Sequence, residues 1–326
     1  MLYIALVPQL GAGPIIRYHD VSDQFTARTI TASGFAYGVR RFIIGLAKKV
    51  LIADQCARIA EPIFKEAPET VTMPVAWLGI IAYAVQIYFD FSGYSDMAIG
   101  LGRMFGFTFL ENFNRPYIAR SLREFWKRWH ISLTNFFRDY VYIPLGGNRG
   151  GTARTYANLL IIFFLTGLWH GASWNFVVWG MIHGLFMVIE RLGFGKVLDR
   201  APRPVGHLYT LAVVLTAWAF FRIEDIAGAW HFAGAMWNPR AGDGVLTYPA
   251  LYLSNVTTLA LVVGVLGSLN AHALLGRALR MPPFTQEAAP AGPWAVAQLI
   301  GITLLFIGVA MQVASSTFSP FIYFRF

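Results

Sequence analysis

Residues 155–189, TYANLLIIFFLTGLWHGASWNFVVWGMIHGLFMVI, contain no Asp, Glu, Lys or Arg over 35 consecutive positions. One helix needs roughly 20 mostly apolar residues to cross a bilayer, so the run is too long for one span and slightly short for two. We therefore predict two shortened membrane helices with a break between them. The candidates for the break are Gly167, Gly171 and the adjacent pair Trp169 and His170.

The composition of the whole chain also indicates a membrane protein. Of its 326 residues 56% are hydrophobic and 13% are charged, and the mean hydropathy is +0.52, whereas soluble domains carry about 25% charged residues. We predict a single all-α, multi-pass membrane domain over residues 1–326 with roughly six or seven spans. Besides 155–189, we expect spans at about 74–100, 206–222, 252–275 and 294–314.

The charged residues indicate what the protein contacts. A net charge of +9 suits anionic lipid head groups or an anionic substrate. Because the basic residues are spread over membrane loops, we expect no nucleic-acid partner. Segment 34–53 mixes four cations with apolar residues at helical spacing, which predicts an amphipathic or interfacial helix rather than a clean span. We also expect a short interfacial helix at 226–237.

The predicted span 74–100 carries two acids, Asp90 and Asp96, within FDFSGYSDMAIG. They are six residues apart and so do not share one helical face. Acids inside a membrane helix are expensive and are usually paired. We expect one of them to be the structural partner of an arginine, and the role of the other stays open.

Residues 113–149 alternate basic and aromatic side chains. Between positions 115 and 154 there are eight Arg or Lys and two acids, Glu124 and Asp139. This mixture is typical of a membrane interface, and the positive-inside rule predicts the cytoplasmic one. Ser121 and Glu124 have the spacing of a capping box that opens a helix.

His170 is the ionisable residue at the centre of the uncharged run. One interpretation is a buried imidazole that hydrogen-bonds a backbone carbonyl. The other is functional, because GLWHGASW combines small residues that allow close approach with large rings that exclude water. His183 follows thirteen residues later in a similar setting. We favour a functional His170 that lines a wet cavity at membrane depth.

His130 lies in FWKRWHISLT, within the basic and aromatic segment. It is either a polar tip at the lipid head groups or part of a pocket in which Lys127 and Arg128 attract an anionic ligand. The remaining histidines, for which we expect structural roles near span edges or in loops, are His19, His207, His231 and His272.

The residue patterns limit the chemistry. Cys56 is the only cysteine, and no HxxxH, HxH or HExxH spacing and no G-x-S-x-G elbow occurs, so we expect no metal, no bound cofactor and no serine nucleophile. A buried histidine can act as general base toward a hydroxyl that attacks an activated acyl group, which is worth typically about 10²–10⁴-fold in rate. The residues alone do not name the substrate.

Several motifs together resemble the membrane-bound O-acyltransferase family, and within it the membrane subunits of alginate O-acetylation. The resemblance covers most of the chain. Its motifs are PQLGAGPIIRY (8–18), KKVLIAD (48–54), QIYFDFSGYSDMAIGLGRMFGF (86–107), ENFNRPY (111–117), REFWKRWHISLTNFFRDYVYIPLGGNR (123–149), LTGLWHGASWNFVVWGMIHG (165–184) and FSPFIYFRF (318–326).

The resemblance implies a helical bundle with interfacial and re-entrant helices around a central funnel in the bacterial inner membrane. It implies that His170 is the buried catalytic histidine of the family and that His130 is the family's second histidine, in the block RWHxSL. The implied donor is acetyl-CoA, reached from the cytoplasm. The acceptor would be a polysaccharide or a periplasmic SGNH-type acetyltransferase partner. Members of this branch usually have further spans before the PQL motif, and the resemblance implies that this chain lacks them.

Other residues near the two histidines complete the expected site. We expect substrate-binding roles for Lys127, Arg128, Trp129, Trp169, Trp174 and Asn175. A rival hypothesis is a transporter or non-catalytic conduit of a polysaccharide-modifying complex, with His170 gating protons. Inverted repeats would favour it, and the sequence shows none. The large rings beside His170 favour a closed reaction chamber.

Overall fold

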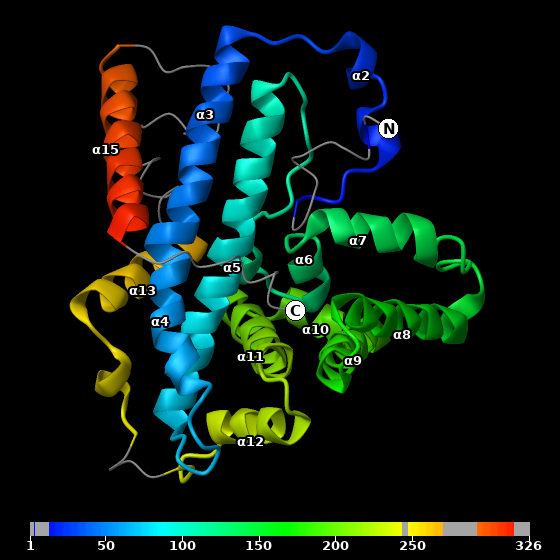
Figure 1. The fold of residues 1–326 in the computed structure, drawn as a ribbon. Coiled ribbons are helices and arrows are strands. Elements are labelled where there is room, and N and C mark those ends of the chain that lie inside the picture. Colours follow the sequence, from blue (N-terminus) through cyan, green and yellow to red (C-terminus); the bar gives the residue numbers. More distant parts are fainter. Residues whose placement is uncertain (1–2, 4–12, 243–246, 270–291, 316–326) are drawn as a thin grey trace.

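The computed structural model describes residue 3 and residues 13–242, 247–269 and 292–315. All regular structure in these ranges is helical, which confirms the predicted all-α class (Figure 1). Residues 8–12, His272 and the ending 318–326, to which sequence expectations were attached, lie outside the described residues. The longer helices are α3 (Ala32–Ala47), α4 (Asp54–Ile63), α5 (Met73–Met104), α8 (Gly151–His170), α9 (Trp174–Ile189), α11 (Arg203–Arg222), α12 (Ile226–Trp237), α13 (Asn255–Ser268) and α15 (Pro293–Ser315).

Shorter helices connect these elements. A π-helical segment, Lys48–Ala53, joins α3 to α4, and another, Glu190–Phe194, joins α9 to α10. The remaining short helices are α1 (Tyr18–Val21), α2 (Gln24–Ala27), α6 (Leu122–Trp126), α7 (Ile131–Phe137), the π-helical Arg138–Tyr142, α10 (Gly195–Arg200) and the 3₁₀ segments Pro116–Ile118 and Pro249–Tyr252.

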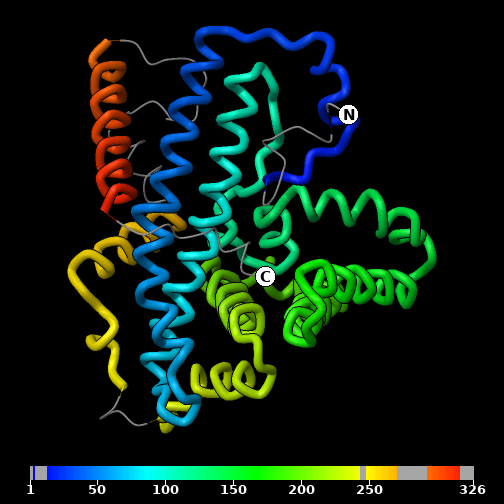
Figure 2. Tube along the Cα trace, in the orientation of Figure 1, coloured from blue at the N-terminus to red at the C-terminus, as the bar shows by residue number. Residues whose placement is uncertain are grey.

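Helix α3 continues through the π-helical segment into α4, and the three together run antiparallel to α5 along its length (Figure 2). The expected interfacial helix at 34–53 is therefore wrong in its placement. The segment is amphipathic, but its basic residues Arg41 and Lys49 are buried against the protein. They pair there with Asp96 and Asp90 of α5, which no pattern within 34–53 indicates.

Glycines let the backbones of α3 and α5 touch. A Cβ placed on Gly38 would lie 2.5 Å from the carbonyl oxygen of Gly100, and a Cβ on Gly45 would lie 2.5 Å from that of Gly93. Arg41 lies between the two glycines of α3 in sequence, and Asp96 lies between those of α5. The spacing of three and four residues puts each set on one helical face. Small residues of this kind allow close packing of membrane helices.

The run 155–189 forms the predicted pair of helices, α8 and α9, with the break at Gly171–Ser173. Gly171 has φ +156°, a conformation that L side chains rarely adopt. Gly167 is not the break. A Cβ on it would lie 2.5 Å from the carbonyl oxygen of Phe176, and one on Gly180 would lie 2.2 Å from that of Phe163. Both glycines therefore bring the two helices of the hairpin into backbone contact.

Among the described residues, four helices are long and apolar enough to cross a membrane, fewer than the six or seven spans expected. The four are Met73–Met104, Trp174–Arg200, Arg203–Arg222 and Pro293–Ser315. The expected span 252–275 contains α13, a shorter apolar helix, and the last residues of that range are not described. The short helix predicted at 226–237 is confirmed as α12.

The α3–α5 contact can be tested with Gly45→Ala. Its Cβ would collide with the Gly93 carbonyl and force the helices apart, so we expect a loss of about 1–3 kcal/mol in the free energy of unfolding. The measurement is thermal unfolding in detergent. Gly308→Ala in α15 is the matched control, because nothing lies within 4 Å of its Cβ position. Equal stability of the two variants would contradict the close contact.

Candidate active site

His130 is the residue at which the chain turns from α6 into α7. Its backbone is left-handed, with φ 44° and ψ 54°, which is uncommon for any residue except glycine. Two backbone hydrogen bonds hold the turn against the connection between α5 and α6, residues 105–121, here called the strap. The Ile131 amide donates to the Asn112 carbonyl at 2.9 Å, and the Asn114 amide donates to the Arg128 carbonyl at 2.8 Å. Strain of this kind persists only where the surroundings impose it, and it clusters at functional sites.

The His130 imidazole is buried, with 4% of the residue exposed, so it is not a polar tip at the head groups. Phe91 meets it edge-on at 4.7 Å between ring centroids, and Phe113 lies nearly parallel at 6.5 Å. Its Nδ1 atom is 3.2 Å from Oδ1 of Asn112. Burial first, and the nearby His170 imidazole second, lower the pKa of His130 well below its ordinary value. His130 is therefore neutral at physiological pH.

His170 is the last residue of α8, directly before the break of the hairpin. Trp179 of α9 and Phe221 of α11 both lie 5.1 Å from its ring, centroid to centroid, and Phe176 lies at 6.2 Å. Three helices thus converge on this imidazole. The predicted setting of small residues and large rings is confirmed, because Gly171 ends the helix and aromatic side chains surround the ring.

A continuous set of stacked and edge-on rings, here called the aromatic wall, runs between the two histidines. Trp179, beside His170, stacks on Trp218 at 5.9 Å. Trp218 lies 5.1 Å from Trp129, and Trp129 lies 5.1 Å from Phe113 beside His130. Trp129 was expected to bind substrate, but it is buried within this wall. The three indoles of this wall are buried and come from α9, α11 and the turn that follows α6.

The other expected substrate-binding residues of the hairpin differ in their exposure. Trp169 is 55% exposed and contacts Phe136 and Phe137, and Trp174 is 75% exposed. Asn175 is buried, and its amide donates a hydrogen bond to the carbonyl of Ile223, the residue after α11. Asn175 thus satisfies a backbone carbonyl at the C-terminal end of α11, which explains its buried position.

The two cations that follow α6 differ in their contacts. Arg128 is committed to Glu124 through its Nη2 atom at 2.8 Å and to the carbonyl of Asn114 at 3.0 Å. Lys127 is exposed. The expected cap is present, because the Ser121 hydroxyl accepts from the Glu124 amide at 3.1 Å. The Glu124 carboxylate, however, accepts from the Arg120 amide rather than from Ser121.

The acids of α5 form buried ion pairs. Asp96 accepts from Arg41 at 2.7 Å and from Lys48 at 2.6 Å, so the expectation of an arginine partner is confirmed. The same guanidinium reaches Glu111 in the strap at 2.5 Å. Asp90, whose role was open, pairs with Lys49 at 2.8 Å. Paired in this way, both carboxylates can remain charged inside a membrane helix.

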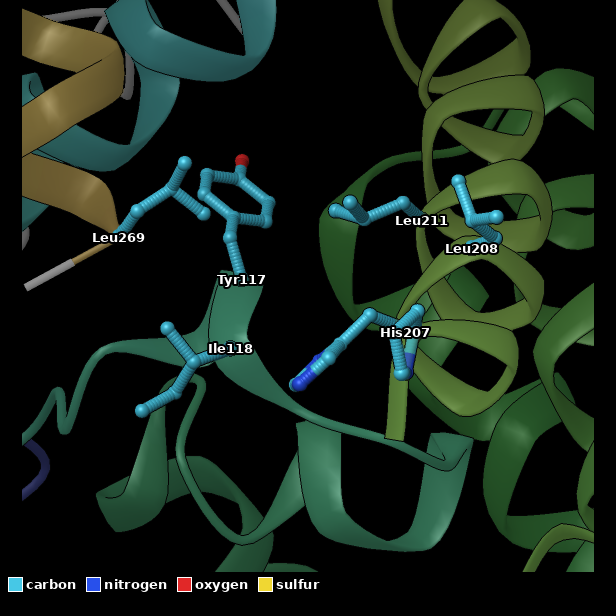
Figure 3. A pocket seen from close by; sticks show the side chains of 7 residues that line it. Tyr117, Ile118, His207, Leu208, Leu211 and Leu269 are labelled. Atoms are coloured by element: carbon cyan, nitrogen blue, oxygen red, sulfur yellow. The ribbon is translucent and has the colours of Figure 1, made fainter. Parts of the chain in front are cut away.

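A cavity of about 440 Å³ lies between α11, the 3₁₀ segment Pro116–Ile118 and Leu269 (Figure 3). His207 borders it, and Nδ1 of His207 lies 3.1 Å from the Ala119 carbonyl, a contact of the kind expected for a structural histidine. Tyr117 and Leu211 make the walls apolar. Neither His130 nor His170 lines this cavity, so the funnel implied by the resemblance stays a prediction.

The comparison with known families decides the class of the protein. Residues 1–227 match the model of the membrane-bound O-acyltransferase family. The chain belongs to this family. It is therefore an O-acyltransferase of the membrane, as the motifs around His130 and His170 predict.

Individual relatives agree with this assignment. The chain is 42% identical to the probable alginate O-acetylase AlgI of Azotobacter vinelandii, over 99% of this chain and 69% of the relative. It is 40% identical to the peptidoglycan O-acetyltransferase of Helicobacter pylori, over 70% of this chain and 44% of the relative. It is 29% identical to the teichoic acid D-alanyltransferase of Bacillus subtilis, over 57% and 50%.

Two further polar residues of this family member were not assigned from the sequence. Asn112 lies in the quoted motif ENFNRPY, but a lone amide gives no chemical signal by itself. His183 is fully buried, and neither ring nitrogen has a hydrogen-bond partner among the described residues. Its ring lies 5.2 Å from those of Trp126 and Trp179. The second histidine of the hairpin is thus part of the aromatic wall.

We expect His183→Phe to leave the unfolding temperature of the purified protein unchanged or raised. A buried polar group without a partner carries its desolvation cost, which an apolar ring of similar shape removes. His207→Phe is the control, because it removes the bond to Ala119 and should cost about 0.5–1.5 kcal/mol. A loss of stability for His183→Phe as large as that for His207→Phe would show that the His183 imidazole has a polar partner.

Proposed function

We propose that this chain moves an acetyl group from acetyl-CoA across the bacterial inner membrane for O-acetylation of an exopolysaccharide such as alginate. His170 acts as the general base. The observation that carries this proposal is the pair of imidazoles, His170 and His130, at the two ends of a buried aromatic wall. The relatives support the substrate class, since their names describe acyl transfer to alginate, peptidoglycan or teichoic acid.

The proposed step is attack of a hydroxyl on a thioester. The hydroxyl oxygen bonds to the carbonyl carbon of the acetyl group while its proton passes to the imidazole of His170. The carbon–sulfur bond then breaks, and the leaving thiolate takes the proton from His170. The products are an acetyl ester and a free thiol, and the imidazole returns to its neutral form.

His130 remains neutral during this step. Its burial already disfavours the charged ring, and a proton on His170 makes a second charge nearby still less favourable. The pair therefore takes up one proton and not two. The lone pair of the neutral His130 ring can accept a hydrogen bond in the site or stabilise the imidazolium that forms on His170. The surrounding rings exclude water, which strengthens both effects.

The donor and the acceptor side complete the proposal. Arg128 is held by Glu124, whereas Lys127 is exposed on the same helix end, so Lys127 is our candidate for attracting the phosphates of acetyl-CoA. On the far side of the membrane we propose that a periplasmic SGNH-type acetyltransferase receives the acetyl group and passes it to the polysaccharide. The acceptor hydroxyl then belongs to that partner or to the sugar.

His170→Ala tests the base directly. In cells that lack this gene, we expect the wild-type chain to restore acetylation of the exopolysaccharide and His170→Ala to fail at equal abundance in the membrane. The acetyl content of the isolated polymer is the measurement. His207→Ala, altered outside the site, is the control and should retain acetylation. Equal rescue by wild type and His170→Ala would make His170 structural and favour a conduit.

His130→Ala should lower acetyl transfer by roughly 10²-fold or more, because the variant loses the neutral acceptor beside the base. The rate of transfer of labelled acetyl from acetyl-CoA in membranes measures this effect. His231→Ala, on the exposed side of α12, is a suitable comparison. Wild-type rates for His130→Ala would remove this residue from the site.

A further inference from the structure

Asn112 has 1% of its surface exposed, and its side chain lies at the centre of a buried hydrogen-bond network. Its Oδ1 atom is 3.1 Å from the Ser132 amide nitrogen, 2.9 Å from the Ser132 hydroxyl and 3.2 Å from Nδ1 of His130. Its Nδ2 atom donates to the Ser95 hydroxyl of α5 at 3.2 Å. One side chain thus connects the strap to α5 and to the start of α7.

The Ser132 amide determines which end of the Asn112 side chain faces His130. A backbone N–H can only donate, so the atom at 3.1 Å from it must be the carbonyl oxygen. The same oxygen faces Nδ1 of His130. Two acceptors would repel each other at this distance, and a carbonyl oxygen has no proton to offer. Nδ1 of His130 therefore carries the proton.

The Ser132 hydroxyl does not provide an alternative partner for Nδ1. Its oxygen is 2.9 Å from Asn112 Oδ1 and 3.4 Å from the imidazole nitrogen, so its single proton favours the amide oxygen. The same hydroxyl oxygen accepts from the Ile15 amide at 3.0 Å. Among the described residues, the groups at hydrogen-bond distance from Asn112 Oδ1 are thus the Ser132 amide, the Ser132 hydroxyl and Nδ1 of His130.

We infer that Asn112 is a positioning residue of the acyltransferase, which holds His130 as the Nδ1–H tautomer and leaves its Nε2 lone pair available in the site. A neutral imidazole has one protonated and one bare nitrogen, so fixing the first determines the second. The role of this lone pair in acyl transfer rests on the proposed function of His130. The tautomer itself rests on the hydrogen bonds alone.

The first experiment reads the tautomer without any activity. The full chain, labelled with ¹⁵N in its histidines, is measured by NMR in detergent or lipid, and His130 is identified by the signals that His130→Gln loses. We expect a protonated Nδ1 and a bare Nε2 in the wild type. The same state is expected for Ser95→Ala, the matched control, which removes only the Nδ2 contact. A protonated Nε2 with a bare Nδ1 in the wild type would overturn the inference.

Two substitutions of Asn112 separate positioning from folding. Asn112→Asp keeps an acceptor for Nδ1 and adds a negative charge, so we expect His130 to hold its second proton to a pH higher by about one unit or more. Asn112→Leu removes the acceptor, and we expect a mixture of the two tautomers. If Asn112→Leu does not fold, Asn112→Asp and the wild type still decide the question. An unchanged His130 titration in Asn112→Asp would overturn the inference.

The same variants are then compared in acetyl transfer from labelled acetyl-CoA. For Asn112→Asp we expect the rate to fall at a higher pH than in the wild type when the medium is made acidic, because a charged His130 opposes protonation of His170. The effect should appear in kcat rather than KM, since the inferred role of Asn112 is exerted through the His130 ring. A loss that is uniform over pH would make Asn112 merely structural. If the wild type itself transfers no acetyl group, the proposed function fails, while the NMR result still decides the role of Asn112.

Discussion

The position of the strap depends on the buried guanidinium of Arg41. It bonds Asp96 on α5 and Glu111 at the start of the ENFNRPY motif, so one side chain ties α3, α5 and the strap together. In a membrane helix a lone Asp96 would be costly, and breaking a buried pair costs about 3–5 kcal/mol because the other charge is left without a partner. Lys48 supplies a second cation to the same carboxylate. The pairing is possible only because Gly38 and Gly45 let α3 approach α5 to backbone contact.

Asn112 directly follows Glu111, so the ion pair between Glu111 and Arg41 also limits where Asn112 can lie. Asn112 fixes the turn before α7 through its carbonyl and its side chain, and that turn holds His130 in a left-handed conformation. Ser95, which accepts from Asn112, precedes Asp96 on the same helix. The ion pairs and the neutral network thus start from adjacent positions of α5. The ion pairs place the strap, and the amide places the imidazole.

The sequence predicted features that depend on local pattern. The break after His170 followed from the length of the uncharged run and from Gly171, and the short helix at 226–237 was expected from its own residues. Features that depend on a distant partner were missed. The cations of α3 look interfacial until the acids of α5 are placed beside them. Asn175 lies two residues from the break and next to Trp174, yet its amide is used by the end of α11, which no local pattern indicates.

The ion pairs of α5 and the neutral hydrogen bonds around His130 have different roles. Between α5 and the helix formed by α3 and its π-helical continuation, full charges are tolerated because cations and carboxylates pair at short distance. Around His130 the structure instead uses a neutral partner, the side-chain amide of Asn112. A carboxylate at that place would favour a charged His130 and so oppose a proton arriving at His170. A neutral amide fixes the orientation and tautomer of the ring without stabilising its charged form. In the proposed function, where His170 takes the proton of the attacking hydroxyl, a neutral His130 of fixed tautomer adds no opposing charge.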